Sequence, residues 1–270
     1  MKVNLLTSPF TLQTIASNNK PTSTITRYCR VMRVLLHTLL GLFIAATLFP
    51  FANNATKAVL IKWWCSKLLT AFNVNVVIEG SPPNNSMKNA ILVANHISWC
   101  DIHALNHVIP LRFIAKSEIK SWPIFGYLVS KANTLFIDRS KRQDAKRTID
   151  IAYKSLESGD NLCFFPEGTT TDGTEIKPFK SSLIQAAILA KSSIWPVSIS
   201  YPNPDGSINT AIAYAGETTL VESMRNMLMQ HAPVIVLHFL PPILPTEYET
   251  MDRRTLTLHI EGLIRKQLNL

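Results

Sequence analysis

The sequence predicts an α/β fold in which helices flank a mixed, largely parallel sheet, with a two-helix membrane hairpin at the N-terminus. Apolar and β-branched runs recur from residue 74 onwards, and helix-like stretches separate several of them. Such alternation is typical of sheets whose strands run mainly parallel. Ahead of these runs lies a long apolar segment flanked by Lys, Arg and Trp, which indicates contact with a membrane. With 270 residues and 47% hydrophobic residues, the chain is large enough for one domain and an appendage.

The N-terminal region divides into a tail and two helices. Residues 1–26 are rich in Thr, Ser and Asn and lack helical periodicity, which predicts a flexible tail. A first helix is predicted over 34–51, and its length of about 27 Å is marginal for a hydrocarbon core of about 30 Å. A second, amphipathic helix is predicted at about 56–72, where Trp63-Trp64 beside lysines suits the headgroup level. We therefore expect residues 27–72 to form a two-helix membrane anchor.

The basic charge is concentrated in this N-terminal region. The net charge is +9, yet eight of the 27 Lys and Arg residues, and no Asp or Glu, precede Glu79. Because the excess charge lies in an apolar region, an anionic lipid surface is a better partner for it than nucleic acid.

Two membrane topologies are compatible with the pattern. If the first helix spans the bilayer, residues 73–270 are exported; if both helices lie in one leaflet, those residues stay on the side of the N-terminus. The cysteines show no CxxC or framework spacing, which is typical of a reducing compartment. We expect the monotopic hairpin, with the domain at the cytoplasmic face of the membrane; a buried core helix and a transit peptide are the alternatives.

Residues 73–270 are expected to form a single α/β domain without internal repeats. Strands are predicted at 74–78, 90–94, 113–115, 134–137, 162–165, 194–200, 211–214 and 234–240. Helices are predicted at 101–109, 118–130, 142–158, 181–191, 218–230 and 252–268. Ligands of such sheets bind at the carboxyl ends of the strands, so polar residues that follow the strands are candidates for a site.

The most informative of these loops runs from Asn95 to Asp101, directly after a buried strand. His96 can take up a proton near neutral pH, and a nearby carboxylate can fix its tautomer and stabilise its charged form. Asp101 is five residues further on, a spacing that does not place both on one helical face, so the chain must turn between them. Alternatively, Asp101 only caps the following helix and His96 is a solvated surface residue.

Two further loops carry candidate binding residues. Arg139 follows the strand at 134–137 and can contact a phosphate with both arms of its guanidinium, or pair with a neighbouring carboxylate instead. Glu167 and Gly168 follow the strand at 162–165, where they can bond a polyol hydroxyl and let a substrate approach the backbone. The alternative for this pair is a simple turn with a helix cap.

In their order along the chain, these blocks resemble the glycerolipid acyltransferase family, specifically its bacterial 1-acyl-sn-glycerol-3-phosphate acyltransferases. NHISWCD at 95–101 matches the first block, FIDR at 136–139 the second, FPEGT at 165–169 the third and IWPV at 194–197 the fourth. The resemblance covers about residues 74–200. One departure is Asn133, where the family usually has Gly; Asn tolerates a left-handed backbone, so we expect the turn to be preserved.

The resemblance implies transfer of a fatty acyl group from acyl-CoA or acyl carrier protein to the sn-2 hydroxyl of a lysophosphatidic acid, at the inner membrane of a bacterium. It implies that His96 is the general base, that Asp101 orients it, and that Arg139 and Lys116 hold the acceptor phosphate. Glu167, Gly168 and Thr169 of the third block would position the glycerol. No metal or other cofactor and no covalent intermediate are expected. Other lysolipids, such as lyso-ornithine lipid, are alternative acceptors.

Three other functions compete with this interpretation. His96, Asp101, His103 and His107 could bind zinc in a metal-dependent hydrolase, although Asp101 and His103 would point to different sides of their helix. Ser98 or Cys100 could act as a covalent nucleophile. A non-catalytic lipid-binding relative is the third. The basic run at 139–147 is either a solvated helix face or a contact for headgroups or acyl carrier protein; its members are Arg139, Lys141, Arg142, Lys146 and Arg147.

Overall fold

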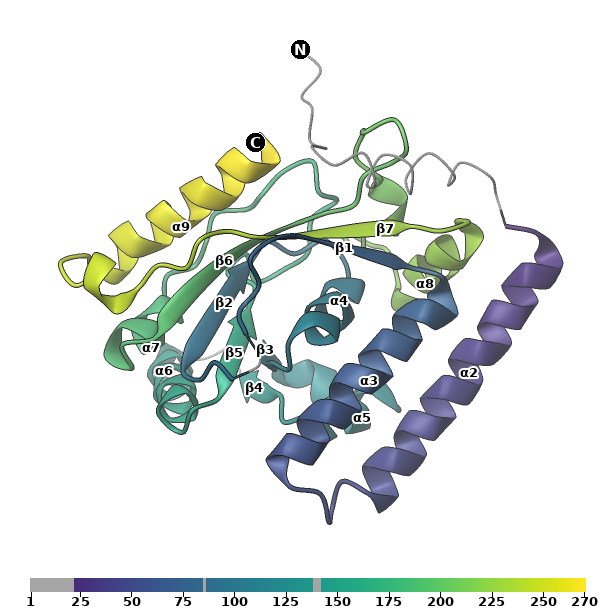
Figure 1. Ribbon diagram of the computed structural model, residues 1–270, viewed down its shortest axis with the longest axis horizontal. Helices are drawn as coiled ribbons and strands as arrows, with labels where there is room; N and C mark the ends of the chain where they lie inside the picture. Colours follow the sequence, from purple (N-terminus) through teal and green to yellow (C-terminus); the bar gives the residue numbers. More distant parts are fainter. Residues whose placement is uncertain (1–21, 85, 138–141) are drawn as a thin grey trace.

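A seven-stranded sheet forms the centre of the protein, as a computed structural model shows (Figure 1). The structure describes residues 22–84, 86–137 and 142–270, without the side chains of 142–145. The strands are β1 (Asn75–Gly80), β2 (Ala90–Ala94), β3 (Arg112–Lys116), β4 (Leu135–Ile137), β5 (Asn161–Phe164), β6 (Ser193–Ser200) and β7 (Val234–Phe239). Their order is β1-β7-β6-β2-β5-β3-β4, and every neighbouring pair is parallel except β6 with β7. The predicted mixed, largely parallel sheet is confirmed.

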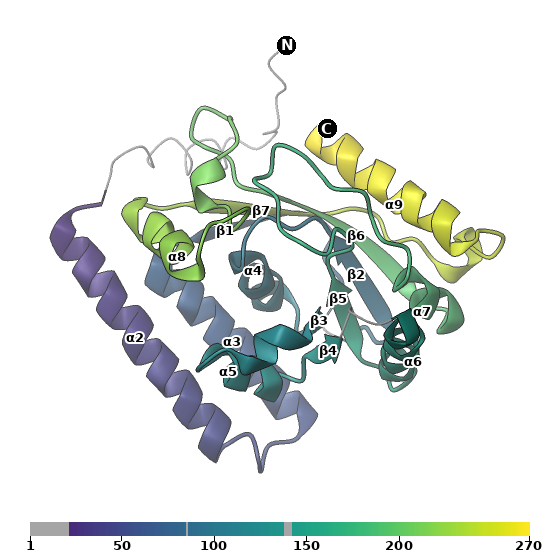
Figure 2. The same cartoon turned by 180° about the vertical axis from the view of Figure 1, so that it is seen from behind.

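Helices cover both faces of the sheet (Figure 2). They are α2 (Thr24–Thr47), α3 (Asn54–Phe72), α4 (Cys100–Val108), α5 (Phe125–Lys131), α6 (Arg142–Glu157), α7 (Ile184–Leu189), α8 (Leu220–Met229) and α9 (Arg253–Leu268), with 3₁₀ turns η1 (Ser117–Ser121), η2 (Thr210–Ile212) and η3 (Pro245–Glu247). Alternate residues of β2 face opposite layers, as the strand pleat requires. Leu92 packs in the core with α3, α4 and α8, whereas Ile91 packs in the core with α6, α7 and α9.

Two element predictions are wrong, for identifiable reasons. The apolar run at 211–214 forms η2 and a loop, in which Tyr214 N donates to Ile97 O, so it fills the core without joining the sheet. Hydrophobicity alone does not separate a short buried strand from such a segment. The helix predicted at 118–130 is divided into η1 and α5, because Pro123 interrupts it. The left-handed turn expected at Asn133 is confirmed, with φ at +59°.

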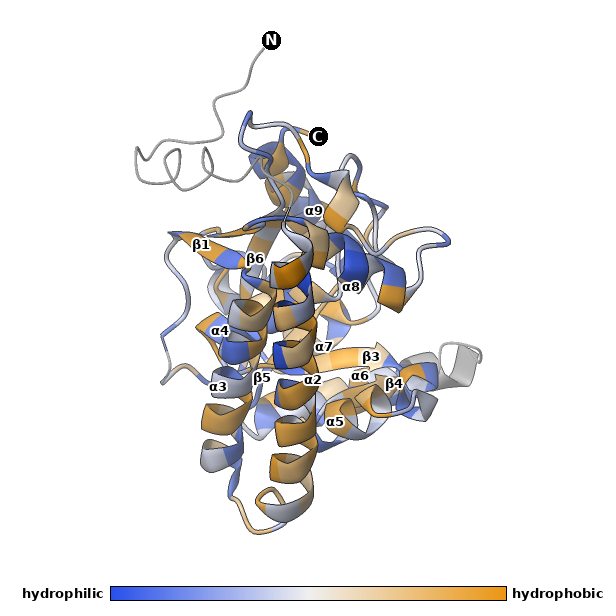
Figure 3. Ribbon diagram, turned by 90° about the vertical axis from the view of Figure 1, so that its right-hand side faces the viewer, coloured by the Kyte–Doolittle hydropathy of each residue, from blue (hydrophilic) through white to orange (hydrophobic). Residues whose placement is uncertain are grey.

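The N-terminal helices differ in extent from the prediction. Ser23 caps α2, so this helix begins well before residue 34 and includes Thr24 to Thr26 of the predicted tail; residues 1–21 lie outside the described part of the chain. α2 and α3 run side by side (Figure 3). Trp64 Nε1 donates to His37 O over 3.2 Å, and a Cβ on Gly41 would lie only 2.5 Å from the same indole nitrogen. Gly41 therefore permits the close approach of the two helices.

The N-terminal part of α2 is also hydrogen-bonded to the segment that follows α8. The Arg30 guanidinium donates to Gln230 O at 2.7 Å and His231 O at 2.6 Å, just after the end of α8. Thr22 Oγ1 donates to Met229 O at 2.8 Å. A cation at the negative end of a helix dipole is favourable. α2 is thus held against the domain at its N-terminal end and against α3 along its middle.

Candidate active site

Three parallel strands bring the predicted site residues to one edge of the sheet. His96 follows β2, Lys116 ends β3, and Glu167, Gly168 and Thr169 follow β5. Of these, His96, Lys116, Gly168 and Thr169 line a single cavity. Arg139 and Lys141 lie outside the described residues, so their predicted contacts have no structural description.

The chain turns between His96 and Asp101, and the two side chains meet. His96 Nδ1 lies 2.8 Å from Asp101 Oδ2. The same oxygen accepts hydrogen bonds from Ile97 N at 2.8 Å and Ser98 N at 2.9 Å, so Asp101 also fixes the turn that precedes α4. The alternative that Asp101 caps this helix is wrong, because the N-cap position is Trp99 and makes no side-chain capping hydrogen bond. The Asp101 side chain is fully buried, and that of His96 retains 16% exposure.

Two residues for which the sequence analysis predicted no role in the site complete this arrangement. Tyr201, itself buried, donates its hydroxyl to Asp101 Oδ1 over 2.5 Å. The His96 ring stacks on Phe165, with centroids 3.8 Å apart and planes 5° from parallel. Phe165 and Tyr201 each come directly after a strand that pairs with β2 in parallel. Both residues lie at the carboxyl end of a predicted strand, and this position in the sequence could have identified them as candidates for the site.

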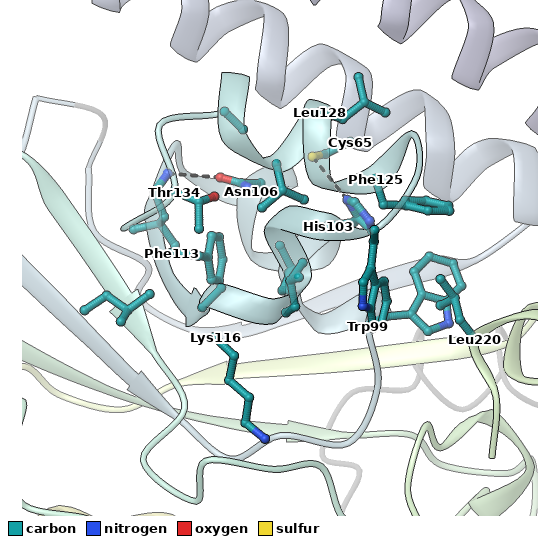
Figure 4. A pocket seen from close by; sticks show the side chains of 18 of the residues that line it. Cys65, Trp99, His103, Asn106, Phe113, Lys116, Phe125, Leu128, Thr134 and Leu220 are labelled. Atoms are coloured by element: carbon teal, nitrogen blue, oxygen red, sulfur yellow. Dashed lines mark hydrogen bonds between the residues drawn. The ribbon is translucent and has the colours of Figure 1, made fainter. Parts of the chain in front are cut away.

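The arrangement leaves one imidazole nitrogen for chemistry. Because the Asp101 carboxylate accepts from His96 Nδ1–H, the lone pair is placed on Nε2. None of the described residues bonds to Nε2. His96 borders a cavity of about 640 Å³, whose other walls are mostly apolar and come from α2, α3, α4, β3 and α5 (Figure 4). A base at the edge of an apolar cavity can deprotonate a hydroxyl that is attached to a lipid.

Glu167 contacts the backbone of His96 and does not line the cavity. Its Oε1 accepts from His96 N at 2.8 Å and its Oε2 accepts from Lys177 N at 2.9 Å. Burial raises the pKa of this carboxyl group, and the two backbone hydrogen bonds partly oppose that increase. Glu167 therefore joins the loop after β5 to the backbone of His96.

The other residues that were considered for a zinc site or a covalent nucleophile do not join the His96–Asp101 pair. His103 Nδ1 lies 3.5 Å from Cys65 Sγ, and His107 Nδ1 lies 2.7 Å from Ser66 Oγ, so both histidines contact α3. Among the described residues, no three His, Cys, Asp or Glu side chains are grouped so that they could hold a metal ion. Ser98 and Cys100 are fully buried and do not line the cavity, and burial raises the pKa of the Cys100 thiol. The geometry favours neither the zinc site nor a covalent nucleophile at these positions.

Tyr201→Phe removes one hydrogen bond from a buried carboxylate and should lower kcat by about tenfold, the value of a hydrogen bond to a charged group. KM for the acyl acceptor should change little, since Tyr201 acts through Asp101 and does not line the cavity. Tyr248→Phe is the matched control, because its buried hydroxyl donates to Ser192 O, at the opposite end of β6 from Tyr201. Steady-state kinetics that show equal kcat for the two variants would contradict the role of Tyr201.

Comparisons with known proteins identify the family of the chain. The family model described as Acyltransferase matches residues 74–200. The lyso-ornithine lipid O-acyltransferase of Pseudomonas aeruginosa is 34% identical over 77% of this chain and 78% of its own length. The 1-acyl-sn-glycerol-3-phosphate acyltransferase of Neisseria meningitidis serogroup B is 36% identical over 55% of this chain and 58% of its own.

A solved structure shares the fold. The crystal structure of the 1-acyl-sn-glycerophosphate acyltransferase PlsC from Thermotoga maritima superposes with a TM-score of 0.60, at 24% identity, over 89% of this chain and 96% of that one. The Pseudomonas relative, by its identity and coverage, establishes the family. The chain belongs to the glycerolipid acyltransferase family and is an O-acyltransferase.

Proposed function

We propose that this enzyme transfers a fatty acyl group from acyl-CoA or acyl carrier protein to the sn-2 hydroxyl of 1-acyl-glycerol-3-phosphate, which yields phosphatidic acid for phospholipid synthesis. The observation that carries the proposal is the His96–Asp101 pair at the edge of a mostly apolar cavity. The cavity suits aliphatic chains, and the pair suits activation of a hydroxyl, which is a poor nucleophile without a base. No metal or other cofactor has a part in this reaction.

In the proposed reaction, His96 Nε2 removes the proton of the acceptor hydroxyl as its oxygen attacks the thioester carbonyl carbon. Asp101 stabilises the resulting imidazolium, as in the serine protease triad, with the substrate hydroxyl in place of the serine. The tetrahedral intermediate then collapses, the carbon–sulfur bond breaks, and the imidazolium returns its proton to the departing thiolate. We propose that the loop after β5, which borders the cavity at Thr169, supplies backbone N–H groups that stabilise the oxyanion.

Acceptor binding is assigned to the same edge of the sheet. Lys116 is exposed in the cavity wall and offers a positive charge to the acceptor phosphate, together with Arg139. Gly168 has φ at +75°, a conformation that favours glycine, and without a Cβ its backbone is open to the glycerol. Thr169 offers a hydroxyl from the cavity wall. For Glu167, the geometry favours positioning of the His96 backbone over direct contact with the glycerol.

Glu167→Gln should destabilise the protein by about 1–3 kcal/mol, because an amide can accept only one of the two backbone hydrogen bonds. The raised pKa means that the folded state holds the carboxyl proton more tightly than the unfolded state. Unfolding free energy therefore falls as pH rises from 4.5 through the raised pKa, and the variant should lack this contribution. Denaturant titrations at several pH values measure both effects, with the exposed Glu175→Gln as control. Equal stability of both variants would contradict the assignment.

We also propose that α2 and α3 attach the enzyme to one leaflet of the bacterial inner membrane, with the domain on the cytoplasmic face. By length and composition, α2 could cross a membrane. However, α2 also packs on α8 and lines the cavity with Gly41, Ile44 and Ala45, so a spanning α2 would draw the domain into the hydrocarbon. Its outward side is apolar instead: Leu36, Leu39 and Phe43 are each about 60% exposed. An exposed apolar surface of this kind suits the interfacial region of a bilayer.

The double variant Leu39→Ser/Phe43→Ser should bind liposomes at least about tenfold more weakly, since each side chain is worth about 1.5–3 kcal/mol when buried. Leu258→Ser on α9 is the matched control, because Leu258 is 68% exposed on a helix remote from α2. Cosedimentation with anionic vesicles measures the binding. If the double variant and the control bind equally, the attachment through α2 is wrong.

The topology has its own test. Cys29 is exposed near the start of α2, and the other three cysteines are buried. Leu270→Cys adds a second exposed thiol at the end of the domain. A maleimide that does not cross membranes should label both positions from the same side of oriented vesicles. Labelling from opposite sides would establish a spanning α2.

Lyso-ornithine lipid is a second candidate acceptor. It is supported by the similarity to the Pseudomonas aeruginosa enzyme, which extends over 77% of this chain. One experiment distinguishes the two acceptors. Purified protein in detergent is offered labelled acyl-CoA with lysophosphatidic acid, lyso-ornithine lipid or other lysophospholipids. We expect transfer to lysophosphatidic acid, whose phosphate can pair with Lys116. Transfer to lyso-ornithine lipid alone would overturn the first assignment and support the second.

A further inference from the structure

Asn106 on α4 is a polar side chain in the mostly apolar wall of the cavity (Figure 4). The residue is only 5% exposed. Its Oδ1 accepts a hydrogen bond from Leu111 N over 3.0 Å, which fixes the orientation of the amide. Its Nδ2 has no hydrogen-bond partner among the described residues. A buried donor without a partner is costly, so such a group needs a water or a ligand to satisfy it.

The amide nitrogen of Asn106 faces the cavity. In the described part of the chain, Trp195 Nε1 is the sole side-chain nitrogen or oxygen that is fully enclosed and unpaired. Asn106 Nδ2 is unpaired but not fully enclosed, and the residue lines the cavity. The small exposed part of this side chain therefore opens into the cavity, where its two N–H groups are available as donors.

His103 places a second polar group on the same side of α4, three residues before Asn106. Its Nδ1 contacts Cys65 Sγ, and its Nε2 has no hydrogen-bond partner among the described residues. Burial lowers the pKa of His103 to about 4, so the imidazole is neutral at physiological pH. A neutral imidazole offers hydrogen bonding without the desolvation cost of a charge.

Asn106 lies further along α4 than Asp101, the partner of His96. Asn106 is six residues beyond the first residue of α4, a rise of about 9 Å along the helix axis. Most other residues of the cavity wall are apolar, and they include Leu111, Phe113 and Leu128. Because Asp101, the partner of His96, lies in the first turn of α4, a substrate that reacts at His96 would reach Asn106 with its aliphatic part.

We propose that Asn106, with His103 beside it, forms a subsite for an oxygen substituent, such as a hydroxyl, on the aliphatic chain of a substrate. The inference rests on the proposed acyl transfer and concerns which aliphatic chain of the substrate the enzyme selects. The Asn106 amide donates to the oxygen of the substituent. A hydroxyl can both donate and accept, so it suits a neutral imidazole in either tautomer. Both the acyl donor and the lysolipid acceptor carry such a chain, and the experiment has one arm for each.

The test uses the full-length protein in detergent and substrates whose aliphatic chains have equal length. In the donor arm, acyl-CoA substrates carry a hydroxyl at different carbons or none, with one lysolipid as acceptor. In the acceptor arm, the hydroxyl is placed on the chain of the lysolipid, and the acyl-CoA is unsubstituted. We expect kcat/KM in one arm to rise about fivefold at one position of the hydroxyl, the effect of one net hydrogen bond.

Variants assign the preference to Asn106. Asn106→Leu should abolish it while unsubstituted chains are still transferred, whereas Thr134→Val, at another polar residue of the cavity wall, should retain it. If the wild-type protein prefers no hydroxyl position in either arm, Asn106 binds only water and the inference is wrong, whether or not Asn106→Leu folds. It is equally wrong if Asn106→Leu keeps the preference. Failure of all transfer to every lysolipid would instead reject the proposed function.

Discussion

His96→Ala should lower kcat for acyl transfer by about 10²–10⁴-fold, the usual contribution of a positioned general base. The reason is the geometry of the ring: Nδ1 is bound to Asp101 at 2.8 Å, and Phe165 stacks on its face, so Nε2 is held toward the cavity. Lysolipid binding should persist, because the apolar part of the cavity wall and Lys116 are unchanged. Turnover of labelled acyl-CoA with saturating lysolipid measures the effect.

The control for this variant is His259→Ala, at an exposed histidine of α9. It should transfer acyl groups at the wild-type rate. Thermal unfolding of both variants shows whether His96→Ala is folded, since the loss of the stacked ring also removes a packing contact. A folded His96→Ala with near wild-type kcat would contradict the assignment of His96 as the base.

Asp101→Asn should lower kcat by about 10³-fold or more, by analogy with the triad carboxylate of serine proteases. The substitution removes the negative charge that stabilises the imidazolium. An amide also satisfies fewer of the four donors that Asp101 now accepts, from His96, Ile97, Ser98 and Tyr201. Because the side chain is fully buried, a loss of stability should accompany the loss of rate.

Asp150→Asn, at an exposed carboxylate of α6, is the matched control and should change neither rate nor stability. Measured at equal fractions of folded protein, kcat of Asp101→Asn separates the catalytic effect from the structural one. A variant that is less stable but fully active when folded would leave Asp101 only a structural role, in which it holds the turn before α4 through Ile97 N and Ser98 N.

The sheet was predictable because its strands carry nearly continuous apolar runs. β2, for example, is fully buried over all five residues, and its sequence is wholly apolar. The run at 211–214 has a similar composition but forms a 3₁₀ turn, since its place is decided by Tyr214 N bonding to Ile97 O. A contact between residues so distant in sequence has no signal in local hydrophobicity.

The candidate site was predictable in its core and not in its surroundings. His96 and Asp101 are close in sequence, so a single turn decides whether they meet. Tyr201 and Phe165 reach the pair from β6 and β5, and only the strand order β6-β2-β5 brings them there. That order depends on crossover connections, which the residue pattern does not specify.

Glu167 shows the limit of interpreting a loop residue by its chemical type. A carboxylate after a strand can bind a substrate hydroxyl or accept backbone N–H groups, and the sequence left both open. The structure shows both oxygens accepting from the backbone, at His96 N and Lys177 N. Burial of the side chain, which decides between the two, arises from packing of the whole loop.

The central claim is that the nucleophile is the lysolipid hydroxyl and that no side chain of the protein carries the acyl group. The most direct test incubates the purified enzyme with acyl-labelled acyl-CoA alone and then adds lysophosphatidic acid. The account predicts that the label stays on CoA until the lysolipid is added and then moves to phosphatidic acid. Label bound covalently to the protein before the lysolipid is added would contradict it.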